Sequence, residues 1–363
     1  MRNFLSDRGR VTRAVGWVLL LGAVIGAVLL GVSPSPYAIE RPGPVYDVLG
    51  TTDVDNKQVP LIDIAGEKTY PTTGKLDMLT VYVDGSPQST LSWIEVAGSW
   101  FDPSRAAVPL DELFPAGETQ HESDAESAID MTNSQQAATA AALSLLKIDY
   151  TTSVEVAQVI KGTPAAGKLK AGDQLVSANG QKVTGLTMLQ QTIIDNGTTK
   201  PVTLVVERAG TEQTVEVTPA VDAQSKNPAI GIYTGDTFTF PFDVKIQLQD
   251  VGGPSAGMML ALGIYDKLTP GSLAGSAHIA GTGTIDPSGA VGAIGGIRQK
   301  MYGARDDGAT WFLAPASNCN EVTGHIPGGL TVFSVKTLDD SLTDVKTIAS
   351  NGDTSKLATC PTK

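Results

Sequence analysis

The chain has 363 residues, a length that fits two or three domains. With 41% hydrophobic and 18% charged residues it is an ordinary globular chain, too apolar for disorder and too polar for more than one membrane span. Its 26 basic and 38 acidic side chains give a net charge of -12, which phosphate backbones repel, so the composition argues against nucleic acid as a partner.

The first segment combines positive charge with a long apolar run. Residues 1–13 carry four arginines against one aspartate, and residues 14–32 contain no charge. A helix of that length covers roughly the 30 Å hydrocarbon core. The run is longer than that of a cleavable signal peptide, and prolines follow it where a cleavage site needs small residues. We therefore expect an uncleaved single-pass anchor in the cell membrane, with a cytoplasmic N-terminus and everything after it outside the cytoplasm.

The rest of the chain divides by composition. Four prolines in residues 33–44 indicate a stiff linker, β-rich runs follow, and residues 123–146 are rich in helix formers. The expected segments are a cytoplasmic N-terminus (1–13), a transmembrane anchor (14–32), a linker (33–44), a β-rich and helical segment (45–147), a second module (148–220), a third module (228–346) and a C-terminal tail (347–363). The strands in residues 46–108 lack an evident core, so we expect this segment to belong to the third module, with the second module inserted.

The two cysteines, Cys319 and Cys360, are a candidate disulfide, because thiols tend to be oxidised outside the cytoplasm. Two unpaired thiols are the alternative, since the sequence gives no distance between them. The three histidines lie far apart and no H-E-x-x-H string occurs. We expect neither a metal nor another cofactor.

The second module contains a recognisable signature. An alternating run at residues 154–160 is followed by Gly162-Thr163-Pro164-Ala165-Ala166-Gly167, then by Gly172-Asp173 and a hairpin turn at Asn179-Gly180. This run resembles the PDZ domains of bacterial proteases. The resemblance implies recognition of an extended peptide beside a helix at 186–194, with closing strands at 202–208 and 213–218. The loop that would hold a peptide carboxylate is expected near residues 146–150.

A serine lies where a strand turns into a helix in the third module. The run 243–248 alternates as a strand, Gly252-Gly253-Pro254-Ser255-Ala256-Gly257 interrupts it, and an apolar helix is expected from Met258 to Leu268. Amide N–H groups at a helix start can hold a developing oxyanion. A serine there is more often a simple helix cap.

A lysine 45 residues later falls on an apolar helix face. Gly295-Gly296 open a predicted helix in which Ile297, Met301 and Ala304 form an apolar stripe, and Lys300 lies on that stripe. Burial disfavours the charged form of an amine and lowers its pKa, so such a lysine can take a proton from a serine. A lysine that merely extends along the apolar face is the alternative.

Together, the Gly253–Gly257 element, the run Ala280–Val291 and the Gly295–Lys300 element resemble the proteolytic domain of Lon proteases. The resemblance implies that Ser255 is the nucleophile, Lys300 the general base and Thr282 the residue that hydrogen-bonds the lysine. Asp250 matches a family acidic residue loosely and is a possible orienting group. The backbone of Gly253 and Ala256 is expected to hold the oxyanion.

The chain as a whole resembles the membrane-anchored PDZ/Lon-like proteases of bacteria, the YlbL-like group. Its expected fold class is α+β, with a transmembrane helix, a PDZ domain and a Lon-type proteolytic domain. The ATPase string G-x-x-x-x-G-K-[ST] does not occur, so the resemblance implies an ATP-independent serine endopeptidase acting on unfolded or flexible extracytoplasmic segments. Its partners are protein or peptide substrates and the membrane, and Lon-like domains often form rings of identical subunits.

Two other functions fit parts of the sequence. One is a non-catalytic, membrane-tethered PDZ adaptor or chaperone with an inactive Lon-like domain. The other is an acyl hydrolase of small esters, which would leave the peptide-binding module without a use. Cleavage of a disordered protein separates the three.

Overall fold

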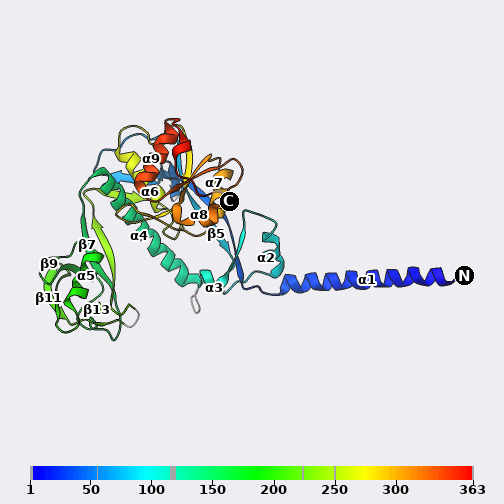
Figure 1. Cartoon of the computed structure of the whole chain (residues 1–363), viewed down its shortest axis with the longest axis horizontal. Helices are drawn as coiled ribbons and strands as arrows, with labels where there is room; N and C mark the ends of the chain where they lie inside the picture. Colours follow the sequence, from blue (N-terminus) through cyan, green and yellow to red (C-terminus); the bar gives the residue numbers. More distant parts are fainter. Residues whose placement is uncertain (1–2, 55, 115–119, 223–224, 249–250, 362–363) are drawn as a thin grey trace. The chain divides into compact units, whose positions relative to one another are not determined.

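The computed structural model describes residues 3–54, 56–114, 120–222, 225–248 and 251–361, with side chains from residue 15 onward except at 187. The chain forms two compact units, and the second interrupts the first in sequence (Figure 1). The first unit comprises Met1–Leu146 and Val244–Lys363, and the second comprises Lys147–Asp243.

The first unit begins with a long helix, α1 (Asn3–Val32). Its Val15–Val32 stretch has a mean hydropathy of 2.5 and none of it is buried. The stretch is long and apolar enough to cross a membrane, a property that a signal sequence shares. The predicted apolar helix is therefore confirmed.

A six-stranded sheet forms the centre of the first unit. Its strand order is β20-β19-β16-β5-β1-β6. Strands β5, β16, β19 and β20 run parallel, and β1 pairs antiparallel with both β5 and β6. The strands are β1 (Tyr37–Asp47), β5 (Lys75–Asp84), β6 (Ala106–Pro109), β16 (His278–Gly281), β19 (Trp311–Pro315) and β20 (Thr331–Val335).

The predicted linker at residues 33–44 is wrong, because most of it is strand β1. The register of β1 against β5 shifts between Pro42 and Val45. Such a bulge accommodates prolines, which cannot donate to the ladder. Gly43 lies within the bulge, where a Cβ would come within 2.4 Å of the Thr80 side chain. The prolines therefore mark an irregular strand that belongs to the sheet.

Helices α6 (Gly257–Leu268) and α7 (Ile297–Asp306) cover opposite faces of this sheet. Successive residues of a strand point to opposite faces. Ala280 of β16 packs in the core beneath α7, whereas a Cβ on Gly281 would meet Met259 of α6 at 2.6 Å. The expected helix from Met258 to Leu268 and the buried stripe of α7 are both confirmed.

Further elements of the first unit complete the layers. The helix former-rich segment is one helix, α4 (Gln120–Leu146), which contacts α6. The remaining elements are β2 (Thr51–Val54), β3 (Lys57–Pro60), β4 (Ile62–Ala65), α2 (Trp93–Ser99), α3 (Leu110–Leu113), β15 (Asp243–Ile246), β17 (Thr284–Ile285), β18 (Val291–Gly292), η1 (Ala316–Asn318), α8 (Cys319–Val322), α9 (Leu338–Ala349) and η2 (Thr354–Lys356). Helix α2 was not predicted, although Ser92 and Glu95 have the spacing of the capping box that begins it.

The C-terminal segment is attached to this unit. The Ser334 amide donates to the Ala358 carbonyl at 2.8 Å. Cys319 and Cys360 form a disulfide that closes a sequence separation of 41 residues. In the chain-entropy model a loop of this size is worth about 4 kcal/mol.

The described part of the second unit contains a sheet with strand order β11-β10-β8-β7-β14, a separate β12-β13 pair and one helix. Asn179 and Gly180 have positive φ angles and form the predicted turn between β8 and β9. The buried Asp173 accepts two hydrogen bonds from Arg208, both at 2.6 Å, which lowers the pKa of that carboxyl. Its elements are β7 (Thr151–Val159), β8 (Gln174–Ala178), β9 (Gln181–Lys182), α5 (Leu186–Asn196), β10 (Val202–Arg208), β11 (Thr211–Val217), β12 (Ala220–Val221), β13 (Pro228–Ala229) and β14 (Ile232–Thr239).

A groove of about 560 Å³ runs along α5 in the second unit. Its other wall is formed by residues 228–234, which lead into the edge strand β14. The segment 146–150, where a carboxylate-holding loop was expected, does not contribute to the described lining. This wall of the groove is therefore formed by residues 228–234, which follow the closing strands β10 and β11, and not by residues 146–150, which precede β7.

Candidate active site

Ser255 lies in the turn that enters α6. Ala256 is the N-cap residue and Gly257 is the first helical residue. A Cβ on Gly257 would come within 2.8 Å of Ile285 and 2.9 Å of Ser134, so only glycine fits between α4 and β17. This close packing fixes the turn and holds the Ser255 hydroxyl at the edge of a pocket.

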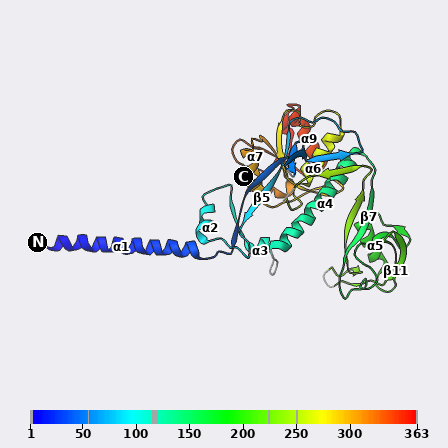
Figure 2. The same ribbon diagram turned by 180° about the vertical axis from the view of Figure 1, so that it is seen from behind.

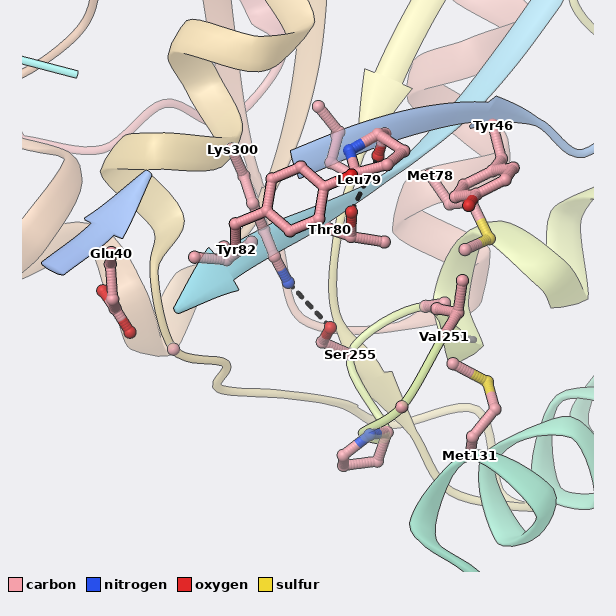
Figure 3. Close-up of a pocket in the computed structure, with 16 residues that line it drawn as sticks. Glu40, Tyr46, Met78, Leu79, Thr80, Tyr82, Met131, Val251, Ser255 and Lys300 are labelled. Carbon is pink, nitrogen blue, oxygen red and sulfur yellow. Dashed lines mark hydrogen bonds between the residues drawn. The ribbon is translucent and has the colours of Figure 1, made fainter. Parts of the chain in front are cut away.

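Lys300 lies in the first turn of α7, directly opposite that hydroxyl. The helix follows Gly296, whose φ of +65° is in the left-handed region and whose Cβ would lie 2.7 Å from Val81. The lysine is only 3% exposed. Its Nζ donates a hydrogen bond to Ser255 Oγ at 2.7 Å, as the dashed line in Figure 3 shows.

Thr282 joins the two. It directly follows β16 and is buried. Its hydroxyl accepts a hydrogen bond from Lys300 Nζ at 3.2 Å and donates one to the Ser255 carbonyl at 3.0 Å. One side chain therefore orients the amine and fixes the backbone of the serine turn.

The pocket beside these groups has a volume of about 570 Å³. Figure 3 shows the Lys300 amine reaching the pocket beneath the ring of Tyr82, with Met131 and Val251 on the far side of Ser255. Its lining is Glu40, Pro44, Tyr46, Met78, Leu79, Thr80, Val81, Tyr82, Met131, Val251, Gly252, Pro254, Ser255, Ala256, Gly295 and Lys300.

Burial sets the charge state of the lysine. Removal of water from the amine lowers the pKa of Lys300 to about 8, while the nearby Glu40 carboxylate acts in the opposite direction. Burial also raises the pKa of Glu40, and the positive Lys300 opposes that shift. Near neutral pH a measurable fraction of Lys300 is therefore an uncharged amine that can accept a proton.

The backbone amides around the serine differ in their partners. Gly253 was expected to hold an oxyanion, but its N–H donates to the Ser127 carbonyl at 2.8 Å. The N–H groups of Ser255 and Ala256 have no acceptor within the described part of the chain. Among the described residues, the amides left to hold an oxyanion at this helix start are therefore those of Ser255 and Ala256.

The remaining predicted site residues are Asp250 and the two cysteines. Asp250 falls outside the described residues. The cysteine pair stabilises the C-terminal segment and does not line the pocket.

His278 is hydrogen-bonded to the buried Asp77. Asp77, His278 and Asp307 could together hold a metal ion, because their ligand atoms all lie within 4.8 Å of one another. Lys75 Nζ already lies 3.4 Å from the Asp307 carboxylate and supplies a cation there.

Sequence reasoning missed the wall formed by β1 and β5. Glu40 lies in the segment taken for a linker, and residues 78–82 were recognised as a strand without a role. The one signal available was the charged pair Glu40-Arg41 inside an otherwise apolar run.

Comparisons with known proteins identify both modules. Residues 128–218 match the family model of the PDZ domain, and residues 249–347 match the Lon protease (S16) C-terminal proteolytic domain. The PDZ match begins within α4 and ends before β14, although β14 completes the sheet of the second unit.

Similar curated proteins include Lon proteases. A Lon protease of Clostridium beijerinckii is 37% identical over 93 residues, which is 25% of this chain and 11% of that protein. Lon protease 1 of Bacillus subtilis is 31% identical over 126 residues, 33% of this chain and 16% of that protein. The chain thus spans less than a fifth of the length of these relatives.

Among solved structures, the PDZ domain of an SdrC-like protein from Listeria innocua is 23% identical. The likeness covers 23% of this chain and 92% of that one, with a TM-score of 0.22. The two domain types predicted from the motifs are confirmed by the family matches, and the mixed α and β class agrees with the structure.

Proposed function

We propose that this chain, which joins a PDZ domain to the proteolytic domain of a Lon-type serine peptidase, is a membrane-anchored and ATP-independent endopeptidase. Ser255 is its nucleophile and Lys300 its general base. The observation that carries the proposal is a buried amine 2.7 Å from the serine hydroxyl. Burial lowers the pKa of this amine to about 8 and places it in direct contact with the serine hydroxyl, which is the arrangement that a general base requires.

The proposed reaction follows from this geometry. Neutral Lys300 takes the proton of Ser255 as its oxygen attacks a peptide carbonyl, and the free amides of Ser255 and Ala256 hold the oxyanion. The lysinium then gives its proton to the leaving amine. Water, deprotonated by the same lysine, hydrolyses the acyl-enzyme. Thr282 keeps the amine aligned throughout.

The substrates we propose are flexible or unfolded segments. The pocket is lined by residues 78–82 of β5 as well as by Ser255, so a flexible segment lying along that strand could bring a carbonyl to the serine. The sequence contains no Walker-type phosphate-binding string with which this chain could unfold a folded substrate at the expense of ATP.

The PDZ domain supplies a second peptide site in this proposal. The groove between α5 and residues 228–234 is apolar on its helix side, where Leu186, Leu189 and Ile193 line it. Strand β14 is at the edge of its sheet, so it can pair with an added peptide strand.

We also propose the topology. The arginines before the apolar helix favour a cytoplasmic N-terminus, which places both domains on the extracytoplasmic side. The disulfide between Cys319 and Cys360 suits that compartment.

The test is cleavage of a disordered protein by the full chain, with and without ATP. Ser255→Ala and Lys300→Ala are each expected to abolish cleavage at unchanged thermal stability or higher, and the matched Ser288→Ala, in an exposed turn, is expected to retain it. Activity that survives either of the first two changes contradicts the assignment. Binding of the substrate without cleavage by the wild-type chain identifies a PDZ adaptor instead.

A further inference from the structure

Large apolar side chains are exposed on α2 and in the turn that follows it. Ile94 is 52% exposed, Trp100 71% and Phe101 89%. Outside α1, no other large apolar side chain in the described part of the chain is as exposed as Trp100 and Phe101. Exposed apolar groups gathered in this way mark an interaction surface.

The direction of these side chains follows from the helix geometry for Ile94 and from their exposure for the other two. At 100° per residue, the buried Val96 and Ser99 define the inner face of α2, and Ile94 falls on the opposite face. Trp100 and Phe101 follow the last helical residue, Ser99, and both side chains are exposed. The Trp93 ring packs edge-on against Tyr37 at 5.8 Å, which fastens the helix to β1. While the inner face of α2 and Trp93 hold the helix to the body, the side chains of Ile94, Trp100 and Phe101 remain accessible to a partner.

The surface lies where α1 ends. Ser35 N–H donates to the Leu91 carbonyl at 2.8 Å, and Pro34 forms a bridge with Ser92, the N-cap of α2. Helices α1 and α2 are in contact. Both views show α2 beside the body end of the long helix (Figures 1 and 2).

We propose that Ile94, Trp100 and Phe101 insert into the interfacial layer of the bilayer that α1 spans. This inference rests on the membrane anchor of the proposed function. Tryptophan is favoured at the membrane interface because its ring is apolar and its N–H finds partners among the headgroups. Because α2 is attached to the end of the membrane-spanning helix, it already lies near that layer and loses little orientational freedom when it inserts.

The charges near the surface identify apolar contact as its binding force. Glu95 is held in the capping box with Ser92, and Asp102 forms an ion pair with Arg105 at 3.2 Å. No cationic side chain lies between Ile94 and Phe101 to attract anionic lipid. The inserted side chains therefore bind zwitterionic bilayers, with little dependence on salt.

Insertion of α2 would hold the proteolytic pocket near the membrane. Glu40 lines that pocket and follows Val32 by eight residues, which span at most about 28 Å of extended chain. Fixed by both α1 and α2, the unit cannot swing away from the bilayer. The segments within its reach are then those that emerge from the membrane surface.

The experiment uses the full chain in phosphatidylcholine vesicles, some of them made with lipids that carry bromine near the carbonyl end of the acyl chains. Trp17→Phe removes the fluorophore of α1 and leaves Trp93, Trp100 and Trp311. Bromine quenching of this variant is expected to fall at least twofold when Trp100→Phe is added. It is expected to be undiminished when the half-buried Trp311 is changed to Phe instead. Phe101→Trp in the variant without Trp17 and Trp100 restores the quenching.

The outcomes separate this surface from the anchor. Flotation of the Trp17→Phe chain with vesicles reports on α1, and failure to float overturns the anchor and this inference together. If the chain floats but bromine quenching depends neither on Trp100 nor on a Trp at position 101, the membrane anchor stands and only the proposal for this surface is overturned. A change of oligomeric state in Trp100→Ser/Phe101→Ser without any bromine quenching assigns the surface to a second copy of the chain and also overturns the proposal.

Discussion

The neutral fraction of Lys300 predicts the pH dependence of cleavage. With a pKa of about 8 for Lys300, roughly 10% of the amine is neutral at pH 7 and about 90% at pH 9. Because kcat/KM follows the free enzyme, it is expected to rise about tenfold between these pH values and then level off. A lysine with its usual pKa near 10.5 would give a rise of about 100-fold without a plateau.

Replacing the neighbouring carboxylate moves this profile in a known direction. Glu40 favours the charged form of Lys300, so Glu40→Gln lowers the pKa of the lysine further. The plateau is then reached at lower pH, and the gain from pH 7 to pH 9 falls below tenfold. Glu207→Gln, at an exposed position of the second unit, is the matched control and is expected to leave the profile unchanged.

The assay is the initial rate on a fluorogenic peptide taken from a cleavage site in a disordered protein, measured from pH 6 to pH 10. If kcat/KM of the wild type rises by nearly 100-fold between pH 7 and pH 9, the pKa of Lys300 is not lowered. A Glu40→Gln profile that coincides with the wild type, or that moves to higher pH, would refute the electrostatic link between the two residues.

Three further predictions concern stability and geometry. Lys300→Met is expected to abolish cleavage but to raise the melting temperature at pH 7. The reason is that the native state disfavours the charged form of Lys300 by up to about 3 kcal/mol below pH 8. Calorimetry should show this gain in stability shrinking between pH 8 and pH 10.5, as the pH approaches the value at which the lysine loses its charge in the unfolded state as well. If the gain is absent, Lys300 is not desolvated. Cys319→Ser/Cys360→Ser is expected to lower the free energy of unfolding by up to about 4 kcal/mol in denaturant titrations, and an equal loss in the reduced wild type is the control. Gly296→Ala is expected to lower the free energy of unfolding by at least about 1 kcal/mol and to slow cleavage. A side chain is strained at a φ of +65° and would press on Val81, so the start of α7 has to move. An unchanged cleavage rate would show that the contact with Val81 does not position Lys300.

Much of the fold could be predicted because local rules agreed with the tertiary result. The apolar run at 14–32, the Asn179-Gly180 turn and the buried stripe of α7 each depend on periodicity or turn chemistry within a few residues. The strand β1 was missed because its prolines oppose a regular ladder, and only the bulge against β5 accommodates them. Helix α2 was missed because it is short and its exposed apolar face lacks the usual pattern.

The candidate site shows the same division. By itself the sequence determined which chemical groups the chain carries: Ser255 before a helix, Lys300 on an apolar helix face and Thr282 between them, in an order that resembles Lon proteases. Only the tertiary structure decided that these groups meet and that Glu40 faces the same pocket. It also decided that the Gly253 amide is already bonded, while those of Ser255 and Ala256 have no acceptor among the described residues. The physical reason is that a pKa and a hydrogen bond depend on distance and burial, which residues far apart in sequence acquire only when the sheet and its two helices pack together.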